Sequence, residues 1–390
     1  MSSERNQLLT RQTRMAIWMA LEISVAVIRL PIFLVYFIPK ALRQHPEWTY
    51  RQAFMTEVLR TWFRYPSTVG LATLFLHPKA NKKRFITIEP AEAALYQDEV
   101  AETYVKPTAI EGTWYPQLYE PEAEQYRLIV LHLEGDVLAS TGSRREDCQF
   151  AVKMFVEEIR AMVFIPRHRY SEDPCDRFPT TLQDAVTSYK YLLDQGIPAA
   201  RIILSGDSLG ANLAVAVLRY ISDHPDLLPN PAASLLWSPR VKFATSMHDT
   251  TTDGSGNSKT NHALGIYNYW GPNTDIPESI HTIDSSISRL DRPFLTNSPI
   301  WIQAGSEEAL LDDIAKFAGI MRQVKGNMVD FFEVKYAPHN ILLLGGILGF
   351  EQEAVGAVRK AREFLRVHDV LKECDMEKPC GFIDENLMWT

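Results

Sequence analysis

Short apolar runs alternate with longer amphipathic stretches through the part of the chain after residue 126. The short runs are rich in Val, Ile and Leu and are typical of strands buried on both faces, whereas the longer stretches follow the helical period. This alternation predicts an α/β fold, with a mostly parallel sheet covered by helices on both faces. The predicted strands are 128–133, 163–165, 202–204, 234–237, 300–304 and 329–334, preceded by edge strands at 84–88 and 110–115, and the predicted helices are 146–162, 180–194, 211–220, 309–324 and 351–367.

The same pattern divides the chain into three parts. Residues 1–80 are predicted to form an apolar helical segment that serves as a cap or a membrane anchor, residues 81–370 the α/β domain, and residues 371–390 a C-terminal tail. Within the domain, residues 240–297 are rich in Thr, Ser, Asp, Asn and Gly. This stretch is too long for an ordinary loop, so we expect it to hold part of a lid. Residues 49–65 are amphipathic and aromatic, which suits a bilayer interface or the roof of an apolar pocket.

Residues 15–38 are apolar almost throughout and are long enough to span a bilayer. Glu22, Arg29 and Pro31 interrupt them, and two central charges cancel the gain from the apolar residues on the membrane-insertion scale. Three interpretations stay open: a signal-anchor helix, a helix that lies at the membrane interface, and a helix packed over the α/β domain. No small-residue cleavage site follows Ile38, so we expect no cleaved signal peptide. We expect an intracellular protein, attached to the endoplasmic-reticulum membrane if this segment inserts.

Composition excludes some classes of function. With 390 residues, of which 46% are hydrophobic, the chain can bury a full core and still carry an accessory segment. The net charge of -8, without any basic run, argues against a nucleic-acid partner. Four cysteines, at 148, 175, 374 and 380, are too few and too scattered for a disulfide framework, and no histidines stand at metal-ligand spacing beside them. We therefore expect neither a metal nor a cofactor.

A sharp turn is predicted at Gly206-Asp207-Ser208-Leu209-Gly210, between a predicted strand and a predicted helix. This is the context in which a G-x-S-x-G motif carries a nucleophilic serine. The flanking glycines permit a turn that is too tight for side chains. The turn places the Ser208 hydroxyl at the start of a helix, where unpaired N–H groups favour developing negative charge. The motif therefore predicts Ser208 as a nucleophile.

The catalytic partners of such a serine follow in the chain order acid, then histidine. His339 lies in a loop just after the last predicted strand and is the natural base. The acid is expected in the loop after the preceding strand, where it would fix the tautomer of the imidazole and stabilise the imidazolium. That loop holds Glu307, Glu308, Asp312 and Asp313, and spacing alone does not choose among them.

Several of these segments together resemble the hormone-sensitive-lipase-like branch of the α/β-hydrolases, and more narrowly its fungal members from secondary-metabolite pathways. The resemblance covers about residues 110–367 and rests on GDSLG, FPTTLQDAVTSYKYLL, LWSPR, AGSEEALLDD and PHN. It implies the α/β-hydrolase fold. In that family the acid opens an acid-small-Leu-x-acid pattern, which implies Glu308 here, with Asp312 and Asp313 as support from the following helix.

One segment departs from the family pattern. The family carries His-Gly-Gly after its third strand, and backbone N–H groups of that motif hold the tetrahedral oxyanion together with the N–H that follows the nucleophile. Glu134, Gly135 and Asp136 occupy these places here. The resemblance implies an oxyanion hole made by Gly135, Asp136 and Leu209. A carboxylate at Asp136 would oppose the developing charge unless it turns away or burial keeps it protonated.

Three hypotheses for function follow. The first is a serine α/β-hydrolase that acts through an acyl-enzyme on an ester or thioester of a hydrophobic, polyketide-like small molecule, with Ser208 attacking, His339 moving the proton and Glu308 orienting His339. The second keeps the fold but catalyses cyclisation, condensation or acyl transfer, with His339 as base and Glu134 and Asp136 as acid or binding groups. The third is a degenerate binding module. An adduct at Ser208 would favour the first, activity that survives Ser208→Ala the second, and binding without turnover the third.

Overall fold

A computed structural model of the chain describes residues 20, 24–25, 27–69, 84–101, 106–124, 127–135, 149–169, 179–241 and 293–372. Several predictions fall outside these ranges. They concern Asp136, all four cysteines, most of the polar insertion at 240–297 and most of the C-terminal tail.

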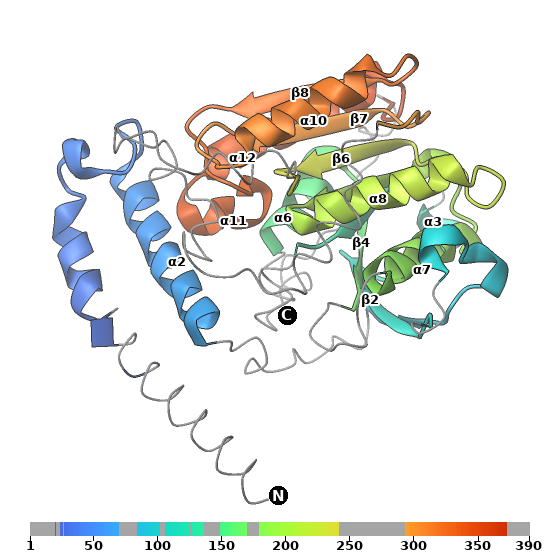
Figure 1. Ribbon diagram of the computed structural model, residues 1–390, viewed down its shortest axis with the longest axis horizontal. Coiled ribbons are helices and arrows are strands. Elements are labelled where there is room, and N and C mark those ends of the chain that lie inside the picture. Colours follow the sequence, from blue (N-terminus) through green and yellow to red (C-terminus); the bar gives the residue numbers. More distant parts are fainter. Residues whose placement is uncertain are drawn as a thin grey trace, which may run out of the picture.

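An eight-stranded sheet forms the centre of the protein, in the order β1-β2-β4-β3-β5-β6-β7-β8 (Figure 1). β2 pairs antiparallel with β1 and with β4, and all other neighbours are parallel, so the predicted mostly parallel sheet is confirmed. The strands are β1 Phe85–Ile88, β2 Ile110–Tyr115, β3 Ile129–Leu133, β4 Met162–Arg167, β5 Ile202–Asp207, β6 Ala233–Trp237, β7 Ile300–Gly305 and β8 Val329–Val334.

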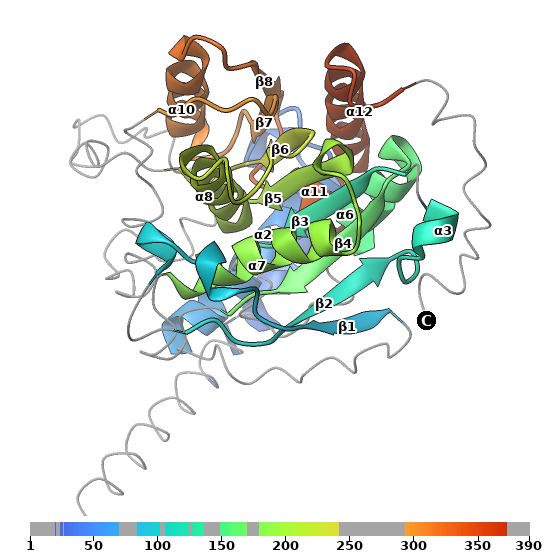
Figure 2. The same ribbon diagram turned by 90° about the vertical axis from the view of Figure 1, so that its right-hand side faces the viewer.

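Helices cover both faces of the sheet (Figure 2). α7 Thr180–Asp194, α8 Leu209–Asp223 and α10 Leu311–Gln323 bury their apolar sides in one core cluster. On the other face, α6 Gln149–Met154, α11 Ile341–Leu348 and α12 Glu351–Val367 share a second cluster. A short helix, α3 Pro121–Glu124, follows β2, and short turns of 3-10 helix lie at Lys40–Leu42, Ala93–Leu95, Asp98–Val100 and Ala199–Arg201.

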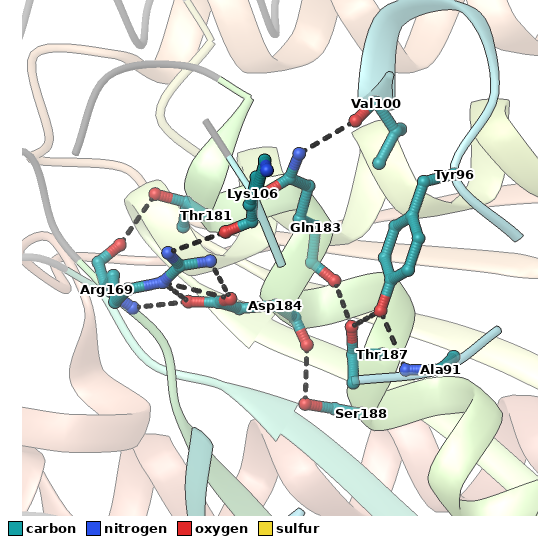
Figure 3. Close-up of polar contacts among 10 residues, drawn as sticks. All are labelled: Ala91, Tyr96, Val100, Lys106, Arg169, Thr181, Gln183, Asp184, Thr187 and Ser188. Carbon is teal, nitrogen blue, oxygen red and sulfur yellow. Dashed lines mark hydrogen bonds and ion pairs between the residues drawn. The ribbon is translucent and has the colours of Figure 1, made fainter. Parts of the chain in front are cut away.

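A polar network joins α7 to the segment between β1 and β2 and to Arg169, which follows β4 (Figure 3). The Tyr96 hydroxyl lies 2.8 Å from the Thr187 hydroxyl, and Gln183 Nε2 donates to the Val100 carbonyl at 2.9 Å. At the start of the helix, the buried carboxylate of Asp184 accepts hydrogen bonds from the backbone and the guanidinium of Arg169. The first two contacts hold the segment between β1 and β2 against α7, and the Arg169–Asp184 contacts hold the chain after β4 against the start of the same helix.

Two elements differ from the sequence predictions. The helix predicted at 146–162 ends earlier than expected: α6 passes into a π-helical turn at Phe155–Ile159, and Arg160 ends it in the left-handed region at φ 64°. Met162 then belongs to β4, because it pairs with Ile129 of β3. The helix α11 was not predicted. Its sequence, ILLLGGIL, is apolar on all sides and so has no helical period to recognise.

The N-terminal segment packs on the α/β domain. Residues 27–36 are helical. Phe37 belongs to the same core cluster as Trp48, and Phe33 packs against that cluster. The Trp48 ring is buried, packs edge-on against Phe350, and donates its N–H to the Tyr336 carbonyl at 2.6 Å. The following helix, α2 Tyr50–Val69, lies beside α11 (Figure 1). In the part of the chain that the structure describes, no helix combines the length and the apolar character that a membrane crossing requires.

Candidate active site

Ser208 stands on a tight turn between β5 and α8. Its backbone has φ 51° and ψ -115°, a conformation that costs energy for any residue with a side chain. The turn depends on its glycines. A Cβ at Gly206 would lie 2.3 Å from the Gly210 carbonyl oxygen, and one at Gly210 would lie 2.0 Å from the Leu133 carbonyl oxygen. The sequence therefore specifies a strained turn that raises one hydroxyl above the carboxyl end of the sheet.

The serine, the histidine and one acid form a continuous chain of polar contacts. Ser208 Oγ lies 3.0 Å from His339 Nε2, and His339 Nδ1 lies 2.5 Å from Glu308 Oε2. All three side chains are buried. A neutral imidazole that donates from Nδ1 to the carboxylate leaves Nε2 free to accept the serine proton. The geometry is that of a nucleophile, a base and an orienting acid.

Of the four acid candidates, the structure brings Glu308 to His339. Glu308 Oε1 also accepts the Gly305 N–H at 2.6 Å and the Ser238 hydroxyl at 3.2 Å. Glu307 turns instead toward His45 of the N-terminal segment, with 4.0 Å between Glu307 Oε1 and His45 Nε2. Asp312 and Asp313 lie in the first turn of α10, where acidic side chains complement the helix dipole.

The predicted oxyanion segment lies beside the serine, with a difference in hydrogen bonding. Gly135 follows β3, and a Cβ placed on it would be 3.3 Å from Ser208 Cβ. Its N–H, however, donates to Asp207 Oδ1 at 3.1 Å, so it would have to leave this bond to serve an oxyanion. Leu209 is the first residue of α8, where backbone N–H groups have no partner within the helix. Asp136 lies outside the described residues.

Sequence reasoning missed a second set of polar residues beneath the serine. Asp207 is buried and accepts a hydrogen bond from Asn340 Nδ2 at 2.6 Å. On β3 and β5, His132 Nδ1 lies 3.1 Å from Ser205 Oγ, which accepts the Trp237 N–H at 3.2 Å. The available signal was a polar residue inside an otherwise apolar strand, at His132 and again at Ser205.

Among the described residues, no group of three or more His, Cys, Asp or Glu side chains is placed to hold a metal ion.

The fold and the site identify the class of protein. The chain belongs to the α/β-hydrolase fold family, whose model matches residues 130–343. The match includes the Ser208 turn, the Glu308 loop and the His339 loop. The α/β-hydrolase fold predicted from the sequence is thereby confirmed.

Known proteins support this membership over parts of the chain. The chain is similar to an acetyl-hydrolase of Streptomyces hygroscopicus, with 42% identity over 83 residues, which are 21% of this chain and 27% of that protein. It is also similar to an esterase of Acinetobacter venetianus, with 32% identity over 151 residues, 38% of this chain and 47% of that protein. The chain therefore matches less than half of the length of either relative.

Solved structures share the fold over a longer span. An esterase from the bacterial hormone-sensitive lipase family superposes with a TM-score of 0.54 and 20% identity, over 82% of this chain and 99% of that chain. A mutant of the esterase rPPE gives a TM-score of 0.55 and 17% identity, over 82% and 96% of the two chains. At this identity the likeness shows the fold alone.

Proposed function

We propose that the protein is a serine hydrolase that cleaves, or transfers, the acyl group of an ester or thioester. The observation that carries this proposal is the unbroken contact chain from Glu308 through His339 to Ser208, on a strained turn at the start of α8. The names of the relatives, an acetyl-hydrolase and an esterase, favour the same chemistry.

In the proposed reaction each of the three side chains has its own role. Ser208 Oγ attacks the acyl carbonyl while His339 Nε2 takes the hydroxyl proton, and Glu308 stabilises the imidazolium. The tetrahedral intermediate collapses, the leaving alkoxide or thiolate takes the proton from His339, and the acyl group stays on Ser208. A water molecule, deprotonated by His339, then releases the acid and restores the serine. Transfer follows the same path with another acceptor in place of water.

The oxyanion would be held by the Leu209 N–H at the start of α8, with Asp136 as a further donor. Gly135 joins them only if its N–H leaves Asp207. Each lost donor of this kind lowers kcat by about 10² to 10³-fold. This pairing favours a second candidate function, a cyclisation or condensation that does not pass through an acyl-enzyme, with His339 as base and Glu134 and Asp136 as acid or binding groups. A binding protein without turnover is the remaining outcome of the test below.

The substrate class rests on the resemblance of the sequence to fungal secondary-metabolism enzymes. We propose a hydrophobic, polyketide-like ester or thioester, with the N-terminal segment 1–80 and the insertion 240–297 forming a cap over the α/β domain of residues 81–370. A comparison of kcat/KM for acetyl and for bulky aromatic esters tests the preference. Equal values for both would contradict it.

The N-terminal helix supports a further element of the proposal, attachment to a membrane surface. Val27, Ile28 and Val35 are 63%, 64% and 67% exposed, although all three are apolar. Exposed apolar residues on a surface helix are suited to lie in the headgroup region of a bilayer. We propose that this helix binds the interface of an intracellular membrane.

Vesicle sedimentation tests the attachment. The full chain should pellet with phosphatidylcholine vesicles, and the double variant Ile28→Glu/Val35→Glu should bind at least tenfold less. Val367→Glu is the matched control, because Val367 is 74% exposed on α12 and should not alter binding. Equal binding by the double variant and the wild type would contradict a role for this helix.

The decisive experiment for the reaction is intact mass after treatment with a fluorophosphonate. We expect one adduct on the wild-type protein, none on Ser208→Ala, and one on Ser222→Ala, a control serine on α8. An unlabelled but folded wild type would contradict acyl chemistry, and screening would then turn to cyclisation and condensation substrates.

A further inference from the structure

Asp207 is a buried carboxylate at the meeting point of three segments that the proposed reaction uses. It directly precedes Ser208 and is 1% exposed. Its Oδ1 accepts the Gly135 N–H at 3.1 Å, and its Oδ2 accepts the side-chain amide of Asn340 at 2.6 Å. One carboxylate thus joins the segment after β3, the nucleophile turn and the loop that carries His339.

A third group faces Asp207 from β3. The Trp237 N–H can only donate, and it donates to Ser205 Oγ, so the serine's own proton is available to His132 Nδ1. A neutral His132 that accepts at Nδ1 carries its proton on Nε2. This nitrogen lies 3.3 Å from Asp207 Oδ1, in an electrostatic contact rather than an aligned hydrogen bond.

The Asp207 carboxylate is buried, so its stability depends on where its hydrogen-bond donors lie. An ionised carboxylate without donors is very costly in a protein interior. Because the donors of Asp207 come from separate segments, displacement of either segment would leave part of its charge uncompensated. The same charge therefore favours one arrangement of all three segments.

Asn340 is placed to transmit this constraint to the base. It follows His339 directly, has a left-handed backbone at φ 57°, and stands at the start of α11. Its N–H donates to Ser238 Oγ at 3.0 Å, and that hydroxyl donates to Glu308. The backbone of Asn340 is thus tied to the acid, and its side chain to Asp207.

We propose that Asp207 is a positioning residue whose carboxylate holds the segment at Gly135 and the histidine loop at Asn340 in register with Ser208. This inference rests on the proposed serine-hydrolase function, because it assigns those segments to the reaction. Asp207 acts through its neighbours and need not touch the substrate.

A reciprocal exchange of the two side chains tests the bond between positions 207 and 340. Asp207→Asn places two amides together, and Asn340→Asp places two carboxylates together. Misplaced catalytic groups lose rate steeply, so each single variant should lower kcat for p-nitrophenyl acetate about 10- to 100-fold, with KM within about twofold. The double variant restores a carboxylate–amide pair and should recover at least part of that loss. Aspartate tolerates both the left-handed backbone and the helix start at position 340.

Asp184→Asn is the matched control. Asp184 is also 1% exposed and accepts three hydrogen-bond donors of Arg169, but it belongs to the network at the start of α7 (Figure 3). Asp184→Asn should melt at a lower temperature than the wild type. Its kcat, calculated per active site that a fluorophosphonate labels, should stay within about twofold of the wild-type value.

Three results would overturn the proposal. One is an Asp207→Asn variant that melts like Asp184→Asn and keeps the wild-type kcat. Another is a double variant that is no faster than the slower single variant. If Asp207→Asn does not fold, Asn340→Gly removes the same bond and keeps the left-handed backbone, and an unchanged kcat in that variant would be the third. Failure of the underlying function is separate, because the wild type itself would then be neither labelled nor active.

Discussion

In two places the described structure brings a serine, a histidine and a carboxylate into contact, in different surroundings. In one, Ser208, His339 and Glu308 come from loops at the carboxyl ends of β5, β8 and β7, with contacts of 3.0 and 2.5 Å. In the other, Ser205, His132 and Asp207 lie on β5 and β3, with contacts of 3.1 and 3.3 Å. The same three kinds of side chain therefore occur twice.

The backbone at each serine accounts for the difference. Ser208 has a positive φ and opens α8, whereas Ser205 lies inside a strand and its oxygen already accepts the Trp237 N–H. The second histidine also binds its serine through Nδ1 rather than Nε2. Residue types alone therefore do not distinguish the two serines. The strained turn and the helix start do, and they are the reason that we propose Ser208 rather than Ser205 as the nucleophile.

The largest effect is expected at the nucleophile. Ser208→Ala should lower kcat for p-nitrophenyl acetate by about 10⁴-fold or more, because the acyl-enzyme cannot form. Steady-state kinetics on the full chain measures it, with melting temperature as the control for folding. Retention of the wild-type rate would place catalysis elsewhere.

The second largest loss of activity is expected at Glu308, the proposed acid. Glu308→Gln keeps the shape of the side chain but cannot stabilise the imidazolium, and it can force His339 into the wrong tautomer. We expect kcat to fall by about 10³- to 10⁴-fold with little change in KM. Glu307→Gln, the neighbouring carboxylate that faces His45, is the comparison, and an equal loss in both variants would contradict the assignment of Glu308.

A methyl group added at Gly210 should destabilise the turn that carries Ser208. Gly210→Ala would drive a methyl group into the backbone of β3, and we expect a loss of about 3 kcal/mol or more in the free energy of unfolding. Gly356→Ala on α12 meets nothing within 4 Å and should be neutral or stabilising by up to about 1 kcal/mol. Urea unfolding measures both. Equal stabilities would show that the turn is less tightly packed than the structure indicates.

The smallest effect is expected at Ser205, in the second set of contacts, which also contains His132 and Asp207. Ser205→Ala leaves the Trp237 N–H and His132 Nδ1 without their partner, and we expect a loss of about 1 to 3 kcal/mol in the free energy of unfolding. Fluorophosphonate labelling should still occur, because Ser208 is intact. A loss of labelling in a folded Ser205→Ala variant would mean that Ser205 takes part in the chemistry.

Local pattern predicted the elements with the clearest period or boundary. The helices at 180–194 and 351–367 and the strands at 110–115 and 329–334 have the bounds that the sequence predicted. The α11 helix was missed because a fully apolar segment has no period. The π-helical turn after α6 was missed because its end depends on strand pairing rather than on the helix sequence.

The site was predictable to different depths. The motif and the chain order pointed to Ser208 and His339, but the choice of Glu308 among four acids needed the family resemblance. Asp207 contacts residues 132, 135 and 340. These positions are far apart along the chain, so no local sequence pattern predicts that they meet. The paired state of the Gly135 N–H was hidden for the same reason.

The bond from Trp48 to the Tyr336 carbonyl decides where the chain can be shortened. An apolar N-terminus is an obvious segment to remove before crystallisation, and a cut at residue 50 would look harmless in the sequence. That cut would uncover Phe350 and leave the Tyr336 carbonyl, three residues before His339, without its donor. A shortened chain should therefore begin before Phe37, which belongs to the same buried cluster.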